Sequence, residues 1–249
     1  MRTVVITGAG SGIGRAMALR QGAAGDRVVV LERDLTAGEE TADAIRAADG
    51  VAEAIQCDVG DAESVAAAFA RVERIDALVN NAGVAHVGNV EKTSPEDFDR
   101  LFRVNVCGVY HCLHATIPRM RFQGGGVVLN MASIAAKVGI RDRFAYSMTK
   151  GAVLSMTLSV ARDYMAENIR CNCICPARVY TPFVDGYIAK NYPAEERRQV
   201  FETLSAYQPI GRMGRPEEIA SLAHFLLSDE AAFITGASYD IDGGVTQLR

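Results

Sequence analysis

The chain has 249 residues, 49% of them hydrophobic and 22% charged, with a formal net charge of −4. This balance is ordinary for a globular protein with a substantial core. A sequence pI of about 5.6 gives no basic surplus for binding nucleic acid or an anionic membrane surface, and no apolar run is long enough to span a bilayer.

Short apolar runs alternate with helix-length segments along the chain. The runs predict strands at 3–7, 27–32, 52–58, 77–81, 127–133, 169–175 and 238–241. The segments between them predict helices. The first follows the glycine-rich turn at 8–14 and extends to about residue 21, and the others cover about 36–48, 62–73, 95–120, 143–167 and 216–227. Asp61 and Ser94 are the predicted N-caps of two of these helices.

This alternation predicts an α/β fold, in which βαβ units build a parallel sheet with helices on both faces. Because no linker, repeat or low-complexity segment interrupts residues 1–249, we expect a single domain with an irregular helical insert at 181–210. Ligands of such sheets bind beyond the carboxyl ends of the strands, where the polar and glycine-rich segments of this chain gather.

Six cysteines are present, and Cys171, Cys173 and Cys175 alternate along one predicted strand. Alternate strand residues point to the same face. A metal site would need further thiols or histidines at zinc spacing, so we interpret these three as small core side chains and expect no bound metal. With no secretory signal in the sequence, we expect free thiols and a cytoplasmic protein.

A glycine-rich segment, Thr7-Gly8-Ala9-Gly10-Ser11-Gly12-Ile13-Gly14, joins the first strand to the first helix. Glycines allow the tight turn and a close approach of the backbone to a pyrophosphate, which the helix N-terminus then stabilises. The spacing differs from the commoner Gly-x-Gly-x-x-Gly, and the absence of a following Lys-Ser/Thr argues against a Walker-type loop. Its place between a strand and a helix predicts a dinucleotide site.

Acidic and amide side chains end the next strands. Glu32 can accept hydrogen bonds from both adenosine ribose hydroxyls and would repel a 2′-phosphate. Arg33 could instead grip that phosphate, but Ser11 leaves the loop without a positive charge, so we favour NAD over NADP. The Asp58-Val59 pair could meet the adenine amino group, with an N-cap role for Asp58 as the alternative. The segment Asn80-Asn81-Ala82-Gly83 could brace neighbouring strands and leave room for the cofactor.

Tyr146 and Lys150 stand at i and i+4 in a predicted helix, so both side chains lie on one face. A phenol ordinarily keeps its proton up to pH ~10, and a neighbouring ammonium favours the phenolate and lowers that pKa. Ser133, at the end of the fifth predicted strand, could donate a hydrogen bond to the oxygen that Tyr146 protonates. Alone, Tyr-x-x-x-Lys also occurs as an ordinary surface pair, so the interpretation depends on the other motifs.

Together these motifs resemble the classical short-chain dehydrogenase/reductase family over the whole chain. The matching residues are Thr7-Gly8-x-x-x-Gly12-x-Gly14, Asn80-Asn81-Ala82-Gly83, Asn105, Ser133, Tyr146-x-x-x-Lys150 and the segment from Pro176 to Thr181. The resemblance implies a doubly wound, Rossmann-type parallel sheet of seven strands, a nicotinamide cofactor and a homotetramer. One departure is Ala177, where the family usually has a glycine after the proline.

The same resemblance implies roles for individual residues. Tyr146 is the expected acid–base residue, Ser133 holds the substrate oxygen, and Lys150 binds the nicotinamide ribose and lowers the pKa of Tyr146. Asn105 is expected to hold a water that links Lys150 to solvent, and residues 181–210 to form a substrate lid. The residues expected to bind the cofactor are Gly8, Ser11, Gly12, Ile13, Gly14, Glu32, Arg33, Asp58, Val59, Asn81, Ala82, Gly83, Tyr146, Lys150, Pro176, Val179 and Thr181.

Four further polar residues point to the substrate class. His86, Arg141, Arg143 and Arg178 offer polar or cationic contacts beside Ser133 and Tyr146, which favours a sugar, a sugar acid or a hydroxy acid. His86 could equally be a surface loop residue, and Arg141 and Arg143 could pair with Asp142 or a partner subunit. The sequence thus predicts an NAD-dependent oxidoreductase that interconverts a secondary alcohol and a ketone.

Three alternatives stay open. The segment 211–218 is also widespread among 3-oxoacyl-carrier-protein reductases, but those prefer NADP and need a basic face, which Glu32 and the net charge of −4 argue against. A hydroxysteroid-type dehydrogenase is a second alternative. A nucleotide-binding protein without catalysis is disfavoured because Tyr146, Lys150, Ser133 and Asn105 are all present.

Overall fold

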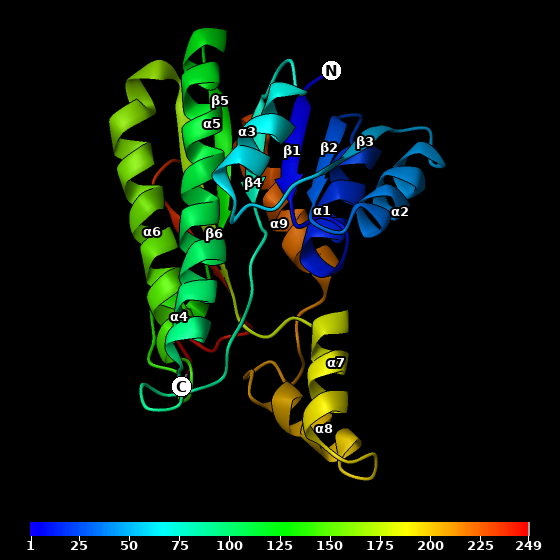
Figure 1. Ribbon diagram of the computed structural model, residues 1–249, viewed down its shortest axis with the longest axis vertical. Helices are drawn as coiled ribbons and strands as arrows, with labels where there is room; N and C mark the ends of the chain where they lie inside the picture. The colour runs from blue at the N-terminus through cyan, green and yellow to red at the C-terminus, as the bar shows by residue number, and fades with distance from the viewer. Residues whose placement is uncertain (249) are drawn as a thin grey trace.

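Seven parallel strands form the centre of the molecule (Figure 1). The computed structural model describes residues 1–248, apart from the side chains of Phe183, Lys190 and Asn191. The strand order is β3-β2-β1-β4-β5-β6-β7, and the direction of winding reverses between β1 and β4. The predicted doubly wound sheet is therefore confirmed. The strands are β1 Thr3–Thr7, β2 Arg27–Glu32, β3 Val51–Gln56, β4 Ala77–Asn80, β5 Gly126–Met131, β6 Ile169–Pro176 and β7 Ser238–Ile241.

Helices cover both faces of the sheet. Helices α1, α2 and α9 pack against one face, and α3, α5 and α6 pack against the other. The α-helices are α1 Gly12–Ala23, α2 Leu35–Arg46, α3 Ala62–Ala70, α4 Pro95–Phe102, α5 Gly108–Gln123, α6 Phe144–Tyr164, α7 Pro182–Asn191, α8 Arg197–Ala206 and α9 Pro216–Leu227. Short 3-10 turns occupy Ile134–Ala136, Met165–Glu167 and Asp229–Ala231.

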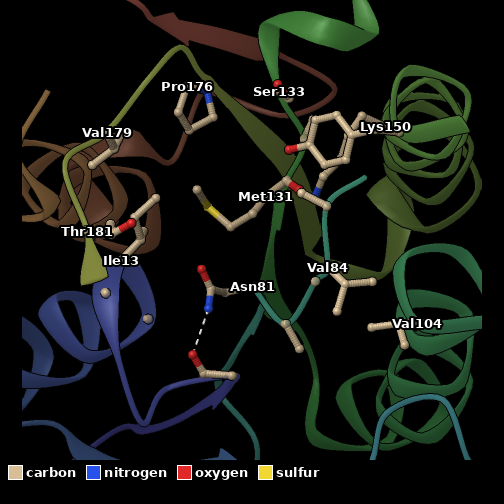
Figure 2. Close-up of a pocket in the computed structure, with 18 of the residues that line it drawn as sticks. Ile13, Asn81, Val84, Val104, Met131, Ser133, Lys150, Pro176, Val179 and Thr181 are labelled. Atoms are coloured by element: carbon tan, nitrogen blue, oxygen red, sulfur yellow. Dashed lines mark hydrogen bonds between the residues drawn. The ribbon is translucent and has the colours of Figure 1, made fainter. Parts of the chain in front are cut away.

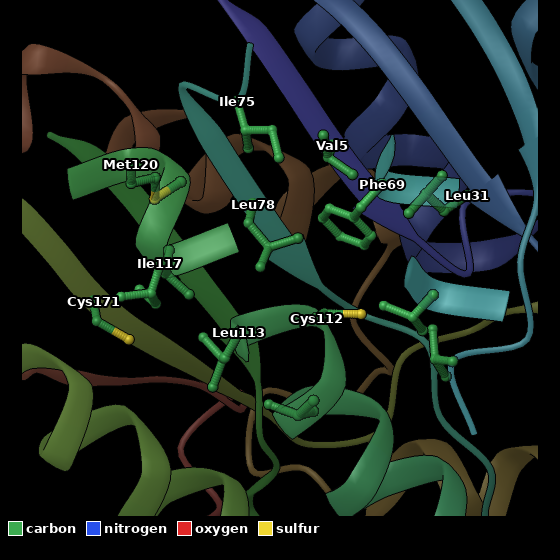
Figure 3. Close-up of a cluster of buried hydrophobic side chains, with 14 of the residues drawn as sticks. Val5, Leu31, Phe69, Ile75, Leu78, Cys112, Leu113, Ile117, Met120 and Cys171 are labelled. Atoms are coloured by element: carbon green, nitrogen blue, oxygen red, sulfur yellow. The ribbon is translucent and has the colours of Figure 1, made fainter. Parts of the chain in front are cut away.

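Each strand of the sheet's centre contributes to two cores. Val5 packs with α3 and α5 on one face, whereas Val4 and Ile6 pack with α1 and α9 on the other. Figure 3 shows the first of these cores, in which Phe69 and Leu78 lie between the sheet and α5. Cys171, Cys173 and Cys175 are free thiols and belong to this same core, which confirms their interpretation as packing residues.

The ends of several elements differ from the sequence-based expectation. The third strand ends at Gln56 and the fifth at Met131, so Asp58 and Ser133 lie in the turns that follow. The helix expected over 62–73 ends at Ala70, because tight turn bonds from Arg71 to Ala68 (3.2 Å) and from Val72 to Phe69 close it early. Asp61 caps it as predicted, by accepting the Glu63 amide at 3.0 Å.

The long helix expected over 95–120 is interrupted. A π-helical turn at Arg103–Cys107 separates α4 from α5, and α5 continues to Gln123, where Gly124 ends it in a left-handed conformation with φ of 89°. Ser94 is the N-cap of α4 as predicted, and it accepts the Asp97 amide at 3.1 Å. Asn105 stands in the π-helical turn, which the sequence pattern did not reveal.

The insert at 181–210 folds as two helices. In Figure 1 α7 and α8 lie apart from the layered body, beyond the carboxyl ends of the strands. The chain enters α7 after a short bridge between Val179 and Gly214, and the Tyr180 ring meets the Phe201 ring of α8 edge-on at 5.4 Å. None of the helices in residues 1–248 combines the length and apolar character that crossing a membrane would require.

Candidate active site

A cavity of about 690 Å³ runs along the carboxyl ends of the central strands. Every residue that the sequence predicted to bind the cofactor lines it. Ser133, Tyr146 and Lys150 line it as well. In Figure 2 Ser133 and Lys150 approach the cavity from one side, Ile13 and Thr181 from the opposite side, and Met131 and Asn81 lie between them.

The glycine-rich loop is packed too tightly for larger residues. Gly8 has a φ of 63°, which favours glycine, and a Cβ on Gly14 would collide with the carbonyl oxygen of Gly8. Asn81 braces the loop, because its Nδ2 donates to the carbonyls of Thr7 at 3.0 Å and Gly8 at 2.9 Å. The buried Thr7 hydroxyl in turn accepts the amides of Asn81 and Ala82, each at 3.0 Å. Helix α1 therefore begins at a rigid turn that faces the cavity.

Glu32 closes the cavity at the end of β2. Its carboxylate accepts the amide of Gly10 at 2.9 Å and the amide of Arg33 at 2.9 Å. A Cβ on Gly10 would lie 3.0 Å from Glu32 Oε2, so a glycine is needed for this contact. Asp58 is half-buried nearby, and its Oδ1 accepts the Gly60 amide at 2.9 Å, which makes it a turn residue while Asp61 caps α3.

Lys150 is almost fully buried in the wall of the cavity. Its side chain is 7% exposed, and Nζ donates to the carbonyl of Met131 at 2.7 Å. Burial takes the ammonium out of water and lowers the pKa of Lys150 to about 8. Nζ lies 5.8 Å from the centre of the Tyr146 ring, which confirms that the two side chains share one face of α6.

The electrostatic effect on Tyr146 differs from the expectation. Burial raises the pKa of Tyr146 above its ordinary value, while a hydrogen bond with Ser133 and the charge of Arg143 act to lower it. The expected lowering by Lys150 was wrong for this state of the protein. The physical reason is that burial of the phenol is the largest effect on this pKa, while the Lys150 ammonium lies beside the Tyr146 ring, 5.8 Å from its centre, and donates to the Met131 carbonyl.

Asn105 lies behind the cavity wall and does not line the cavity. Its Oδ1 accepts the Val84 amide at 2.8 Å, and its Nδ2 donates to the Val84 carbonyl at 2.9 Å and to Thr149 Oγ1 at 3.1 Å. Both amide hydrogens are therefore used within the protein, and a water contact would have to use the second lone pair of Oδ1 or the main-chain carbonyl. Gly83 leaves space there, since a Cβ on it would lie 3.2 Å from Asn105 Oδ1 and 3.7 Å from Lys150 Nζ.

Two of the four predicted substrate residues reach the cavity. Arg143, the residue that precedes α6, and Arg178, which follows β6, both line it and are half-buried. Arg141 does not, because its side chain is 97% exposed and lies beside Asp142. His86 is absent from the described lining, and its Nδ1 lies 3.5 Å from Asp97 instead.

Sequence reasoning gave no role to Thr149, and it placed Tyr207 only within the expected lid at 181–210. Thr149 is fully buried and links the Tyr146 carbonyl, 2.8 Å from its hydroxyl, to the Asn105 amide. Tyr207, at the end of α8, lines the cavity and places its ring 5.2 Å from the Arg178 guanidinium carbon. A polar residue beside Lys150 on the buried side of the helix could have indicated Thr149, whereas no local pattern marks Tyr207.

These features fit a dinucleotide. The tightly turned glycine loop leaves the start of α1 facing the cavity, where a pyrophosphate would be stabilised by backbone amides. The Glu32 carboxylate stands at the strand end where ribose hydroxyls would be bound, and Lys150 is a buried donor at the opposite end. The lining therefore offers one set of donors for phosphates and separate groups for two riboses.

Comparisons with known proteins show what the chain as a whole is similar to. Residues 8–246 match a family model described as enoyl-(acyl carrier protein) reductase. An oxidoreductase of Thermotoga maritima without an assigned substrate is 38% identical over 249 residues, which cover 99% of this chain and 98% of that protein. The 2-keto-3-deoxy-L-fuconate dehydrogenase of Xanthomonas campestris is 36% identical over 96% of this chain and 78% of its own length. The crystal structure of levodione reductase superimposes with a TM-score of 0.93 at 33% identity, over 100% of this chain and 98% of that one.

Proposed function

Because this chain belongs to the short-chain dehydrogenase/reductase family and is an oxidoreductase that acts on CH–OH groups, we propose that it interconverts a secondary alcohol and a ketone with NAD. The observation that carries the proposal is the meeting of Ser133, Tyr146 and Lys150 at one cavity whose other end is the glycine loop and Glu32. NAD, when bound, supplies the acceptor of the hydride that leaves the carbinol carbon.

Tyr146 is the acid–base residue in this proposal. In the oxidation direction its phenolate accepts the hydroxyl proton of the substrate, and in the reverse direction its hydroxyl returns a proton to the carbonyl oxygen. Ser133, which hydrogen-bonds with Tyr146, holds the same substrate oxygen. Burial keeps the pKa of Tyr146 high in the free protein, so added positive charge at the site is what brings the phenolate into the working range.

Lys150 and Asn105 support Tyr146 from behind. The Lys150 ammonium holds a fixed place through the Met131 carbonyl and offers two more donors, which suit ribose hydroxyls. Asn105 is a positioning residue, because its amide ties the Val84 backbone to Thr149 and so to α6. The space beside Gly83 between Asn105 and Lys150 suits a water that carries the proton towards solvent.

Glu32 supports the choice of NAD over NADP. The carboxylate is held in the cavity by the amides of Gly10 and Arg33, so it cannot swing aside without losing both bonds. A 2′-phosphate at this place would meet a fixed negative charge. Arg33 is exposed beside it and offers a positive charge, which makes the contribution of Glu32 measurable by substitution.

The substrate class that we propose is a sugar, a sugar acid or a hydroxy acid. Arg143 and Arg178 at the cavity support an anionic or hydroxylated substrate, and the similarity to a 2-keto-3-deoxy-L-fuconate dehydrogenase agrees with it. Residues 181–210 are the proposed lid, since α7 and α8 lie beyond the strand ends and contribute Pro182, Val184 and Tyr207 to the lining.

We also propose a homotetramer. Phe122 on α5 is 95% exposed and Leu158 on α6 is 49% exposed, so the outer faces of these helices present apolar side chains that a second copy would cover. Light scattering of the purified protein would measure the mass, and a monomer would contradict this part of the proposal.

The proposed activity is tested with a panel of sugars, sugar acids, 2- and 3-hydroxy acids, neutral secondary alcohols and an acetoacetyl thioester. Each compound is assayed with NAD or NADH and with NADP or NADPH, and turnover is followed by the absorbance of the reduced cofactor at 340 nm. We expect turnover of hydroxy compounds with NAD. Turnover confined to the thioester with NADPH would contradict the proposal and favour a carrier-protein reductase.

A further inference from the structure

Two arginines face the reaction end of the cavity without a carboxylate partner. Of the described residues, the acidic ones that line the cavity are Glu32 and Asp58, and both stand at the opposite end, beside the glycine loop. Arg143 is bonded by Nη1 to the carbonyls of His86 at 3.4 Å and Asp142 at 3.3 Å. These are neutral acceptors at long distances, so most of the Arg143 charge is left for another group.

Arg178 is still less satisfied. Its Nε is buried without a hydrogen-bond partner among the described residues. Burial lowers the pKa of its guanidinium first, and the nearby charge of Arg143 lowers it further, which shows that the two cations lie within electrostatic reach of each other. Two like charges held together in a half-buried place are costly unless an anion joins them.

The backbone fixes both arginines. Gly88 bridges the chain on either side of Arg143, through its amide to Asp142 at 2.9 Å and through its carbonyl to Phe144 at 3.1 Å. Gly214 binds the carbonyl of Arg178 with its amide at 2.9 Å. The guanidinium carbon of Arg178 lies 5.2 Å from the centre of the Tyr207 ring, within the range of a cation–π contact, and such a contact uses none of the guanidinium N–H donors as a hydrogen bond to a carboxylate would.

Arg143 also connects this pair to the chemistry. Its charge reaches Tyr146, because it is one of the groups that lower the pKa of that phenol, and it stands three positions before Tyr146 in the chain. Tyr146, Arg143 and Arg178 all line one cavity, and Arg143 lies within electrostatic reach of the other two. A substrate whose carbinol meets Tyr146 can therefore present a charged substituent to the two guanidinium groups.

We propose that Arg143 and Arg178 bind a carboxylate of the substrate, so that the protein oxidises hydroxy acids in preference to neutral alcohols. This inference rests on the proposed function for the position of the carbinol. A planar guanidinium and a carboxylate match as a bidentate pair, and joining the anion to both arginines offsets the repulsion between them. A neutral analogue of the substrate carries no anion, so it leaves the repulsion between the two arginines in place and gains no such interaction.

The test compares matched pairs of substrates that differ in one charge. Sodium 3-hydroxybutyrate is paired with 2-butanol, and sodium lactate with 2-propanol, at constant ionic strength with NAD. In the unmodified protein we expect kcat/KM for the better acid to exceed that of its neutral partner by about 100-fold, and Arg178→Leu to reduce this ratio to about fivefold or less. Arg198→Leu removes an arginine that is 91% exposed on α8, and it should leave the ratio unchanged.

Binding is measured separately from turnover. Acetate, methanesulfonate and inorganic phosphate are titrated into the complex with NADH while its fluorescence is followed, with chloride as the ionic-strength control. Saturable binding of acetate that is lost in Arg178→Leu supports the carboxylate site. If this binding is seen but none of the alcohols is oxidised, the proposed function fails while the carboxylate site stands. Tighter binding of phosphate or methanesulfonate than of acetate would overturn the assignment to a carboxylate.

Two further results would overturn the proposal. One is equal turnover of acids and neutral alcohols with no saturable binding of acetate, which would leave the proposed function intact. The other is a parallel loss of acid and neutral turnover in Arg178→Leu and in the charge-retaining Arg178→Lys, because this would make Arg178 a structural residue. We expect Arg178→Lys to recover part of the preference for acids that Arg178→Leu removes.

Discussion

The ammonium of Lys150 lies 5.8 Å from the centre of the Tyr146 ring, one turn along α6. The arrangement is costly, because Lys150 is 7% exposed and its charge is compensated by the neutral carbonyl of Met131. Lys150 therefore loses its proton at a pKa of about 8, well below the usual value of 10.5. A buried cation maintained at such a cost beside a phenol is what a site prepared for proton transfer requires.

We predict that Lys150→Met stabilises the free protein at neutral pH while it abolishes turnover. The shift in the pKa of Lys150 from 10.5 to about 8 corresponds to a cost of about 3 kcal/mol in the folded state. The variant also leaves the Met131 carbonyl without a hydrogen-bond donor, and this loss offsets about 1 kcal/mol of the gain in unfolding free energy. Urea unfolding at pH 7 measures the net effect, with the exposed Lys92→Met as the matched control.

The same variant tests the direction of the pH dependence. Between about pH 8 and pH 10.5 the unfolded chain binds more protons at Lys150 than the folded protein does, so the stability of the wild type rises with pH there. The cost is fully present below pH 8 and disappears towards pH 10.5. We therefore expect the advantage of Lys150→Met to shrink as pH rises, and an advantage that stays constant across this range would contradict the assigned pKa.

Glu32→Gln separates the charge of this residue from its structural bond. The amide oxygen can still accept the Gly10 amide, now 2.9 Å from Oε2, so the loop should keep this contact, whereas the exposed Arg33 amide loses its acceptor at Oε1. Without the negative charge, the exposed Arg33 can interact with a 2′-phosphate, and we expect kcat/KM with NADP to rise about tenfold while that with NAD falls a few fold. Kinetics with both cofactors measure the ratio. If Glu32→Gln leaves the ratio of kcat/KM with NAD to kcat/KM with NADP unaltered, Glu32 does not determine which cofactor is preferred.

Gly83→Ala tests the space between Asn105 and Lys150. The new methyl group would lie 3.2 Å from Asn105 Oδ1 and 3.7 Å from Lys150 Nζ, so it fits only by occupying the place proposed for a water. We expect kcat to fall about tenfold and the pH profile of kcat to shift, with a loss of about 1 kcal/mol in unfolding free energy because Asn105 must move away from the 3.2 Å contact. Gly151→Ala on α6, where a Cβ would meet no described atom within 4 Å, is the control. Equal kcat values for the two variants would argue against the water.

Local sequence patterns predicted the elements well, and they predicted as cofactor-binding a set of residues that the structure brings to one cavity. The glycine loop and Asn81 directly follow strands, and Glu32 is the last residue of β2. Parallel strands bring such positions to one edge of the sheet, so their meeting follows from the alternation alone. The i, i+4 spacing of Tyr146 and Lys150 was likewise enough to place them on one face of α6.

The sequence was less informative where position depends on tertiary packing. Arg141 and Arg143 are two residues apart, yet Arg141 is 97% exposed and Arg143 lines the cavity, because the bridge to Gly88 fixes the chain at that point. The π-helical turn around Asn105 depends on backbone bonding that single residues do not encode. The raised pKa of Tyr146 arises from burial, which the i, i+4 spacing cannot report.

Tyr146→Phe tests the central claim most directly, because it removes the phenol oxygen and keeps the ring beside Lys150. We expect kcat/KM for alcohol oxidation to fall by about 1,000-fold. NADH affinity, measured by fluorescence titration, should stay within about threefold of the wild type, because the cofactor contacts that we propose lie mainly elsewhere in the cavity. A variant that reduces NAD at the wild-type rate would show that another group moves the proton, and would contradict the account.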